Sequence, residues 1–410
     1  KSDVNGLSGV TVLVPQVEAL GMIAVMRSLG AAGATVHAVS SSPDALGFHS
    51  RYANQKVLGP PGSHPEFSAW LKSYIHKHDI DVVMPTESLV LALLASLDQF
   101  APWLPISLEP ERLKLAFSKA RLQELFNQHG ISQNTPDHFV CTRNNVSEVA
   151  SACTSFSFPL FVKVDAVDAL PECSGNSFVR PVTDFAELKR TCERMLEDFS
   201  HVLVQSFATG KGAGVNCLRW NGELASLSNL CDHESPHIGG LSTLRRVWSN
   251  PSMEADAAHR LQALDWRGVG MLEYRVDPIS GKFNFIELNA RFWAALHLCL
   301  FAGADFPRFL VERHLGRAPT FPESWQPARA CYDVPGEIAY VSSMLKDPAV
   351  SVVQKVLAVA GLPKPYLDPR IRLDLFYPGD HRPYVVNVLR FFGMSRWVAR
   401  AEATSWVVRP

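Results

Sequence analysis

Alternating strand and helix patterns across residues 10–100 constrain the fold more than any other feature of this chain. In chain order, the alternating segments are Val10–Val14, Glu18–Gly33, Thr35–Ser40, Pro65–His78, Asp81–Pro85 and Glu87–Phe100. The first, third and fifth are short apolar runs typical of buried strands, and the others have helical periodicity. Strands that alternate with helices in this way predict an open parallel α/β sheet.

The turn after the first strand argues against a dinucleotide site in this sheet. Dinucleotide-binding sheets carry a glycine-rich turn at that point, where the backbone approaches the phosphates. Here the turn reads VPQVEALG, with Pro15 and Glu18 in place of glycines. A dehydrogenase is therefore disfavoured.

Composition and charge narrow the class of partner. The 410 residues predict roughly two to four domains. A net charge of -1 gives no overall attraction to nucleic acid or to an anionic membrane. The longest apolar stretches, Leu89–Leu97 and Phe292–Gly303, are shorter than the roughly 20 residues of a membrane-spanning helix. We expect small-molecule partners, with no nucleic acid and no membrane.

The cysteines and the N-terminal residues favour a cytoplasmic location. The eight cysteines form no CxxC pair, so neither a metal knuckle nor a disulfide scaffold is predicted. The N-terminal segment KSDVNGLSGVTVLVPQ lacks the apolar core of a secretory signal. We expect reduced, mostly buried thiols.

A second group of motifs follows the proline-marked segment Ala101–Leu113. A helix is predicted over Glu111–Ile131, and strands are predicted in Phe158–Asp165 and His201–Glu223. The segment Gly270–Arg291 predicts a hairpin whose turn is DPISGK. The residues after Pro327 carry no recognisable motif.

The second strand of that hairpin, FNFIELNAR, carries an unusual polar face. Side chains alternate along a strand, so Glu287, Asn289 and Arg291 project to one side, and Glu273 lies on the facing strand. Two carboxylates and an amide oxygen suit Mg²⁺, or alternatively Mn²⁺, which would complete its coordination with phosphate oxygens. Arg291 would then supply positive charge to a phosphoryl group. A solvated hairpin face remains the alternative on these residues alone.

Four motifs in order resemble the ATP-grasp superfamily. They are FSKARLQELFNQHGISQNTPDHF, FPLFVKVD, VLVQSFATGKGAGV and FNFIELNARF, within a resemblance that runs from about Leu113 to Leu315. The stretch from GKGAGV to GADFP is similar to the uncharacterised carboxylate-amine ligase branch. The resemblance implies an N-terminal open parallel-sheet (pre-ATP-grasp) domain over residues 1–112. A two-lobed α+β ATP-grasp domain would follow over 113–318, with a small lobe at about 138–207 and a large lobe at about 208–318. Residues 319–410 would be a C-terminal extension.

The resemblance also implies roles for individual residues. Lys119 and Lys163 would contact ATP phosphates, and Arg291 and Arg245 would be catalytic cations near the transferred phosphate or the substrate carboxylate. The metal ligands would be Glu273, Glu287 and Asn289. The nucleotide-binding hinge would comprise Gln205, Ser206, Phe207 and Ala208.

The sequence departs from the superfamily pattern in two places. The phosphate-covering loop is poor in glycine, and its candidates are Ser174, Gly175, Asn176 and Ser177. The acidic residue expected for the ribose hydroxyls is absent from the hinge, where Ser206 and Lys211 stand instead. The ribose contact is therefore not assigned.

Two further segments are candidate substrate sites. HESPH, from His233 to His237, matches the zinc-protease pattern, but Pro236 would break the helix that this pattern needs. We predict a loop near the acyl site instead, with His233 or Ser242 contacting substrate; an ordinary loop histidine is the alternative. In MPTES, Thr86 and Glu87 follow a strand end and frame the substrate, or Thr86 only caps the next helix, which is favoured.

Together these features predict an ADP-forming ligase that joins a small carboxylic acid or amino acid to an amine through an acyl phosphate, using ATP and Mg²⁺. No covalent nucleophile is needed, so the cysteines are not catalytic candidates. The alternatives are an enzyme of the same superfamily that uses another nucleophile, such as a thiol, or an ATP-binding regulator without catalysis. A homodimer is the expected assembly.

Overall fold

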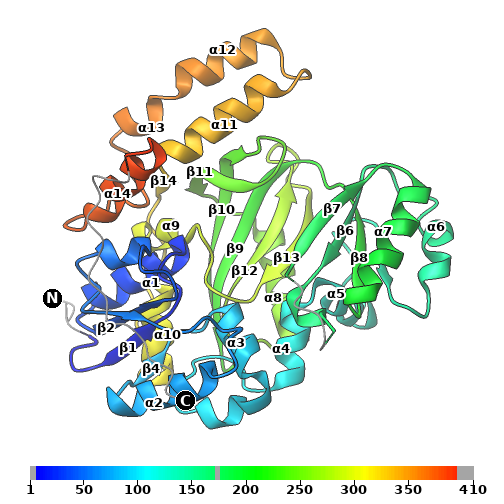
Figure 1. Ribbon diagram of the computed structural model, residues 1–410. Helices are drawn as coiled ribbons and strands as arrows, with labels where there is room; N and C mark the ends of the chain where they lie inside the picture. Colours follow the sequence, from blue (N-terminus) through cyan, green and yellow to red (C-terminus); the bar gives the residue numbers. More distant parts are fainter. Residues whose placement is uncertain (1–5, 171–175, 395–410) are drawn as a thin grey trace.

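The computed structural model describes residues 6–170 and 176–394, which form three β-sheets and their covering helices (Figure 1). The mixed α/β architecture predicted from the sequence is confirmed. Within the described residues, no helix is long and apolar enough to cross a membrane. The described cysteines are all free and buried, as expected for reduced thiols.

The first sheet is parallel, with the strand order β3-β2-β1-β4. Its strands are β1 (Thr11–Val14), β2 (Thr35–Ser40), β3 (Gln55–Leu58) and β4 (Val82–Val83). Its helices are α1 (Leu20–Ala31), α2 (Phe67–Lys77) and α3 (Glu87–Leu93), with the 3₁₀ turns η1 (Leu46–His49) and η2 (Leu94–Phe100). The strand order changes direction between β1 and β4, because β2 and β3 are added on one side of β1 and β4 on the other. The carboxyl ends of β1 and β4 therefore flank the point where ligands bind in open parallel sheets.

One long helix was expected over Glu111–Ile131, and this expectation was wrong. The segment forms two helices, α4 (Pro110–Phe117) and α5 (Lys119–Gln128), that meet at Ser118. Ser118 has extended backbone angles, and its hydroxyl accepts a hydrogen bond from the Arg121 N–H as the N-cap of α5. The side chain thus satisfies an otherwise unpaired helix N–H, which favours a new helix start. The break places Lys119 at the first turn of α5.

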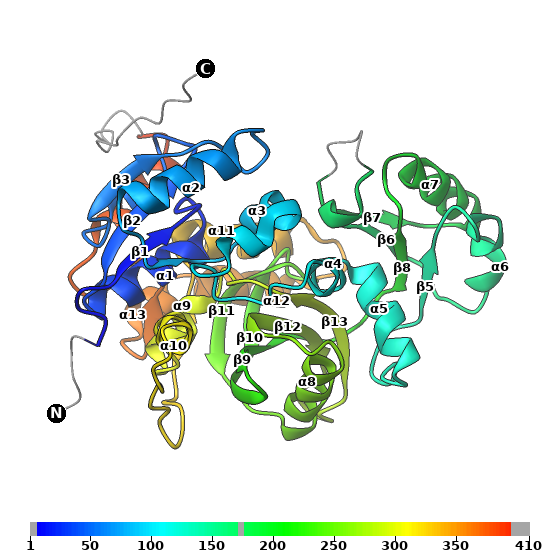
Figure 2. The same cartoon turned by 90° about the horizontal axis from the view of Figure 1, so that it is seen from below.

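The second sheet is antiparallel, with the order β5-β8-β6-β7. Its strands are β5 (His138–Cys141), β6 (Leu160–Val164), β7 (Phe178–Val182) and β8 (Val202–Ser206). Its helices and turns are η3 (Val146–Glu148), α6 (Val149–Ala152), η4 (Ala166–Asp168) and α7 (Phe185–Asp198). Helix α7 packs its buried face on this sheet around a separate apolar core (Figure 2).

The third sheet has seven strands in the order β13-β12-β9-β10-β11-β14-β15. The strands are β9 (Lys211–Trp220), β10 (Glu223–Ser235), β11 (Leu241–Val247), β12 (Gly268–Val276), β13 (Phe283–Asn289), β14 (Arg329–Cys331) and β15 (Ile371–Leu373). The accompanying helices are α8 (Pro251–Ala263), α9 (Leu296–Phe301) and α10 (Phe306–His314). On β12, Leu272, Tyr274 and Val276 are fully buried in the core shared with α8. The alternate residues of β12, including Glu273, therefore face the other side of the sheet.

The C-terminal residues contribute helices and two strands. The helices are α11 (Val334–Lys346), α12 (Val352–Gly361), α13 (Lys364–Leu367) and α14 (Arg382–Phe391). Strand β14 pairs with β11, and β15 pairs with β14, so this region continues the third sheet. Helices α11 and α12 form a hairpin that projects from the body (Figure 1). The domain boundaries predicted from the sequence remain predictions.

The HESPH segment is not a helix, as expected, but it is also not the predicted loop. Strand β10 extends through His233, Glu234 and Ser235, and the turn begins at Pro236. The extension has a physical cause, because β11 supplies pairing partners for these residues, with bulges on both sides of His233.

Candidate active site

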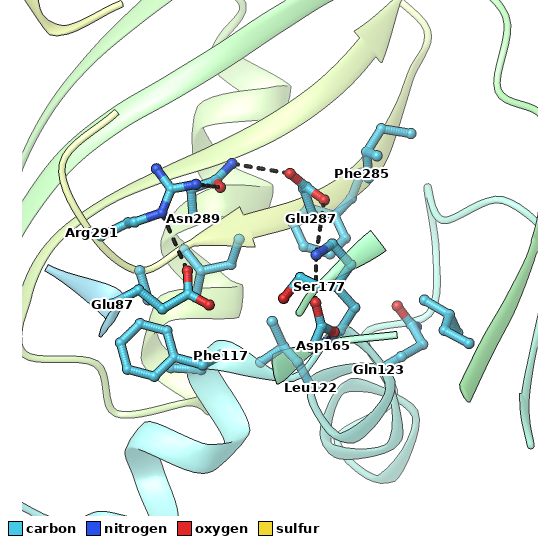
Figure 3. Close-up of a pocket in the computed structure, with 16 residues that line it drawn as sticks. Glu87, Phe117, Leu122, Gln123, Asp165, Ser177, Phe285, Glu287, Asn289 and Arg291 are labelled. Carbon is cyan, nitrogen blue, oxygen red and sulfur yellow. Dashed lines mark hydrogen bonds and ion pairs between the residues drawn. The ribbon is translucent and has the colours of Figure 1, made fainter. Parts of the chain in front are cut away.

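Glu287, Asn289 and Arg291 form a row at the end of β13 (Figure 3). The Asn289 amide donates to Glu287 Oε1 at 3.2 Å, and Arg291 Nη2 donates to Asn289 Oδ1 at 3.1 Å. Arg291 Nε also contacts Glu87 Oε2 at 3.3 Å. The row thus combines a carboxylate, an amide and a guanidinium that fix one another's orientation.

Glu273 and Glu287 lie directly opposite each other in the β12–β13 ladder. Burial, and then the charge of Glu287, raise the pKa of Glu273 to about 7. Within residues 6–170 and 176–394, no group of three or more His, Cys, Asp and Glu side chains is arranged to hold a metal ion. Two facing carboxylates beside an amide oxygen nevertheless fit Mg²⁺, which needs few protein ligands, and a cation between them would offset their repulsion.

Two lysines approach this pair from other elements. Lys119 Nζ lies 2.7 Å from Asp165 Oδ1 and 3.4 Å from Glu287 Oε2. Burial opposes the charge of Lys119, but Glu287 and Asp165 outweigh it and raise its pKa above the usual value. On β6, Lys163 donates to Gln205 Oε1 at 2.6 Å, and burial lowers its pKa. Burial would raise the pKa of Glu287, yet Lys119 and Lys163 hold it below its usual value.

A cavity of about 120 Å³ lies between these elements. Its walls come from α3, α4 and α5, from the second sheet and the segments that follow its strands, and from β13. The chemically active side chains that line it are Glu87, Lys119, Asp165, Ser177, Glu287, Asn289 and Arg291. Lys163 and Glu273 do not line it, although both interact electrostatically with Glu287.

Asp165 is a site residue that sequence reasoning missed. Its carboxylate accepts from both the backbone N–H and the Nζ of Lys119, and only 3% of the residue is exposed. Asp165 therefore fixes the start of α5 and aims Lys119 at Glu287. The sequence does contain one indication of this role: Asp165 follows Lys163 by two residues, so the two side chains lie on the same side of an extended segment.

The predicted hinge is the connection between the second and third sheets. Strand β8 ends at Ser206, β9 begins at Lys211, and Phe207 and Ala208 lie between them. Gln205 is 2% exposed, and its amide nitrogen has no hydrogen-bond partner among the described residues. An unpaired buried donor at this connection fits a polar ligand edge such as that of a nucleotide base.

A second cavity, of about 450 Å³, adjoins the first and shares Glu87, Ser177 and Arg291 with it. Thr86 also lines this cavity, and its hydroxyl accepts from the Leu89 N–H as the N-cap of α3. The structure thus brings Thr86 and Glu87 to Arg291, which is distant in sequence. Asn176 lines the same cavity, whereas Ser174 and Gly175 lie outside the described residues.

Comparisons with known proteins place this geometry in a structural context. No family model matches the chain. A protein of Emericella nidulans named "Putative urea carboxylase" is 23% identical over 278 residues, which are 62% of this chain and 21% of that protein. The chain therefore spans about a fifth of the length of this curated relative.

Several solved structures resemble the chain over a larger share of its length. Biotin carboxylase from Campylobacter jejuni has a TM-score of 0.59 at 14% identity, covering 79% of this chain and 76% of that one. N5-carboxyaminoimidazole synthetase from Staphylococcus aureus has a TM-score of 0.58 at 14% identity, covering 80% and 83%. The L-amino acid ligase from Bacillus licheniformis has a TM-score of 0.54 at 15% identity, covering 75% and 73%. This chain has the ATP-grasp fold.

Several predicted residues lie away from both cavities of this ATP-grasp fold. On β10, His233 contacts Glu337 Oε2 through Nδ1 at 2.8 Å and stacks on the Tyr340 ring, so it joins the sheet to α11. Ser242 lies on β11 opposite Glu234, and Lys211 begins β9. None of these three lines either cavity. Their predicted contacts with ligands remain predictions.

Arg245 also lies outside both cavities of the ATP-grasp fold, in an ion pair with Asp374. It is fully buried, and its Nη2 lies 2.8 and 2.7 Å from the two carboxylate oxygens of Asp374. Burial raises the pKa of Asp374 to about 6 even though Arg245 acts to lower it. This contact joins β11 to the loop after β15, which gives Arg245 a structural role independent of the predicted catalytic one.

The Arg245–Asp374 pair yields a stability prediction. We expect Arg245→Met to lower the free energy of unfolding by about 3–5 kcal/mol, because it leaves the Asp374 carboxylate buried without its partner. The double variant Arg245→Met with Asp374→Leu is expected to recover most of this loss. Urea unfolding of the three proteins measures the effect, and a single variant as stable as the parent would contradict it. If the double variant is stable but inactive, the Arg245–Asp374 pair contributes to activity beyond its effect on stability.

Proposed function

We propose that this protein is an ADP-forming ligase that joins a small carboxylic acid to an amine. The observation that carries the proposal is the group formed by Glu273, Glu287, Asn289 and Arg291 with Lys119 3.4 Å from Glu287. Carboxylates, an amide and the cations Lys119 and Arg291, with Lys163 close by, suit a reaction whose main demand is the neutralisation of phosphate charge. The ATP-grasp fold and the likeness to named ligases and carboxylases support it.

The residues divide into groups according to what they would bind. Glu273, Glu287 and Asn289 would hold Mg²⁺, which supplies charge neutralisation and orients phosphate oxygens when it is bound. Lys119 and Lys163 would bind phosphates of ATP, and Gln205 with residues 206–208 would receive the base. Arg291 lies between the proposed metal ligands and the second cavity, so it would bind the phosphoryl group that is transferred from ATP to the acid.

The proposed reaction has two steps. A carboxylate oxygen of the acid attacks the γ-phosphorus of ATP, the bond from that phosphorus to the bridging oxygen breaks, and ADP leaves with the bond's electron pair. The nitrogen of a neutral amine then attacks the carbonyl carbon of the acyl phosphate, and phosphate leaves as the carbon–oxygen bond breaks. The nitrogen releases its proton to phosphate or water. The chain's contribution is to orient the reactants and to stabilise their charges.

One observation disfavours the alternative of a regulator that binds ATP without catalysis. Nucleotide binding alone needs the hinge and the lysines, yet Arg291 continues the row from the metal ligands into a second cavity. A second cavity beside the phosphate site is what an enzyme with a second substrate needs. No contact in the described residues favours a thiol over an amine as the acceptor.

An assay of ADP release tests the proposal. The protein is incubated with ATP, Mg²⁺ and hydroxylamine, together with a panel of amino acids and other carboxylic acids. Hydroxylamine is a small nucleophile that converts acyl phosphates into hydroxamates, which form coloured complexes with ferric iron. The proposal predicts that at least one acid gives ADP and hydroxamate in equal amounts. If no acid does so, or if the nucleotide product is AMP, the proposal is wrong.

A further inference from the structure

The second cavity lies where the first sheet meets the row on β13. Gln16 follows β1, Thr86 and Glu87 follow β4, and Arg291 follows β13, and all four line the cavity. These first-sheet residues stand at the carboxyl ends of the two strands that flank the change of direction, where open parallel sheets bind ligands. The volume of about 450 Å³ is within the usual range for small-molecule sites.

The charges that line this cavity form a single close pair of opposite sign. Among the described residues that line it, only Glu87 and Arg291 carry charge, and Arg291 Nε lies 3.3 Å from Glu87 Oε2. The two side chains are 29% and 39% exposed, respectively, so both are accessible to a ligand. The remaining walls combine neutral polar groups with apolar side chains, among them Met22, Leu91 and Phe292.

Arg291 does not depend on Glu87 alone for its position. Its Nη2 donates to Asn289 Oδ1 and its Nη1 donates to the carbonyl oxygen of Phe292, both at 3.1 Å. The Glu87 carboxylate is therefore available for a ligand cation, while Arg291 extends from the metal ligands toward a ligand anion. An α-amino acid presents an ammonium and a carboxylate on the same carbon, which matches two adjacent charges of opposite sign.

We propose that the acid activated at this site is an α-amino acid with an apolar side chain, and that Glu87 is the residue that recognises its ammonium group. This inference rests on the proposed function and specifies its substrate. The carboxylate lies on the Arg291 side, next to the cavity lined by Lys119 and Glu287. The side chain of the amino acid packs against Met22, Leu91 and Phe292.

A comparison of two acids that differ only in the amino group tests this role. Leucine and 4-methylpentanoate are each assayed for ADP release with saturating ATP, Mg²⁺ and hydroxylamine. The parent protein is expected to have a kcat/KM for leucine at least tenfold above that for 4-methylpentanoate. In Glu87→Gln, the ratio of the two values is expected to fall by about 10- to 100-fold, the size of a lost charge-assisted hydrogen bond.

Glu66→Gln, an exposed position in the same domain, is the matched control and is expected to leave the ratio unchanged. Thermal melting of both variants verifies that they fold. If Glu87→Gln lowers both acids equally, Glu87 acts only through Arg291 and the inference is overturned. The inference also fails if neither acid supports ADP release while another acid of the panel does, an outcome that leaves the ligase proposal intact. Failure of every acid overturns the ligase proposal itself.

Discussion

Replacing Glu287 with glutamine is expected to lower kcat/KM for ADP release by about 100- to 1,000-fold, the usual loss when one group that stabilises transition-state charge is removed. The substitution keeps the shape of the side chain but removes half of the carboxylate pair formed with Glu273. It also removes the charge that Lys119 Nζ approaches at 3.4 Å. Steady-state assays at several Mg²⁺ concentrations measure the loss.

The fold is expected to survive Glu287→Gln, since the side chain is 22% exposed and an amide oxygen can still accept from Asn289. The melting temperature of the variant verifies this. Glu323→Gln, an exposed position outside both cavities, is the matched control and is expected to retain full activity. Full activity in Glu287→Gln itself would refute its proposed role as a metal ligand.

Replacing Lys163 with methionine is expected to weaken ATP binding and to lower kcat/KM for ATP by about 100-fold or more. Lys163 is 8% exposed, and burial lowers its pKa, so a positive charge there carries a desolvation cost that an anionic ligand would offset. A buried lysine that contacts Gln205 at the hinge and interacts with Glu287 is well placed for a phosphate. Calorimetric titration with ATP measures binding directly.

The melting temperature of Lys163→Met distinguishes a role of Lys163 in ATP binding from a role in stability. Methionine has a similar length and no charge, so Lys163→Met is expected to melt at or near the temperature of the parent despite losing the bond to Gln205. Lys189→Met, at an exposed position on α7, which packs on the same sheet, is the control and is expected to bind ATP normally. Unchanged ATP affinity in Lys163→Met would show that the lysine serves only the packing of the second sheet.

The elements that the sequence predicts well are those with strong local patterns. The strand Thr35–Ser40 and the hairpin of β12 and β13 agree with prediction, because apolar alternation and the DPISGK turn are local signals. The division between α4 and α5 depends on a single capping hydroxyl, Ser118, within an otherwise continuous helical pattern. The strand at His233 depends on β11, which the local sequence of HESPH does not reveal.

The residues of the site also divide into those that local sequence predicts and those that only the fold brings together. The row on β13 follows from the alternation of a strand, so its shared direction was predictable from Glu287, Asn289 and Arg291 alone. The pairing of Arg245 with Asp374 and that of Arg291 with Glu87 join residues 129 and 204 positions apart, and no local pattern encodes such contacts. Only the fold reveals that Arg245 is committed to an ion pair and that Glu87 reaches the row.

The transfer of oxygen from the acid to phosphate tests the central claim most directly. The most active acid of the panel is labelled with ¹⁸O in its carboxylate and incubated with the protein, ATP, Mg²⁺ and hydroxylamine, and the phosphate released is analysed by mass spectrometry. If the carboxylate attacks the γ-phosphorus, each phosphate carries one ¹⁸O atom from the acid. Unlabelled phosphate would contradict the account, because ATP would then be cleaved without activation of the carboxylate.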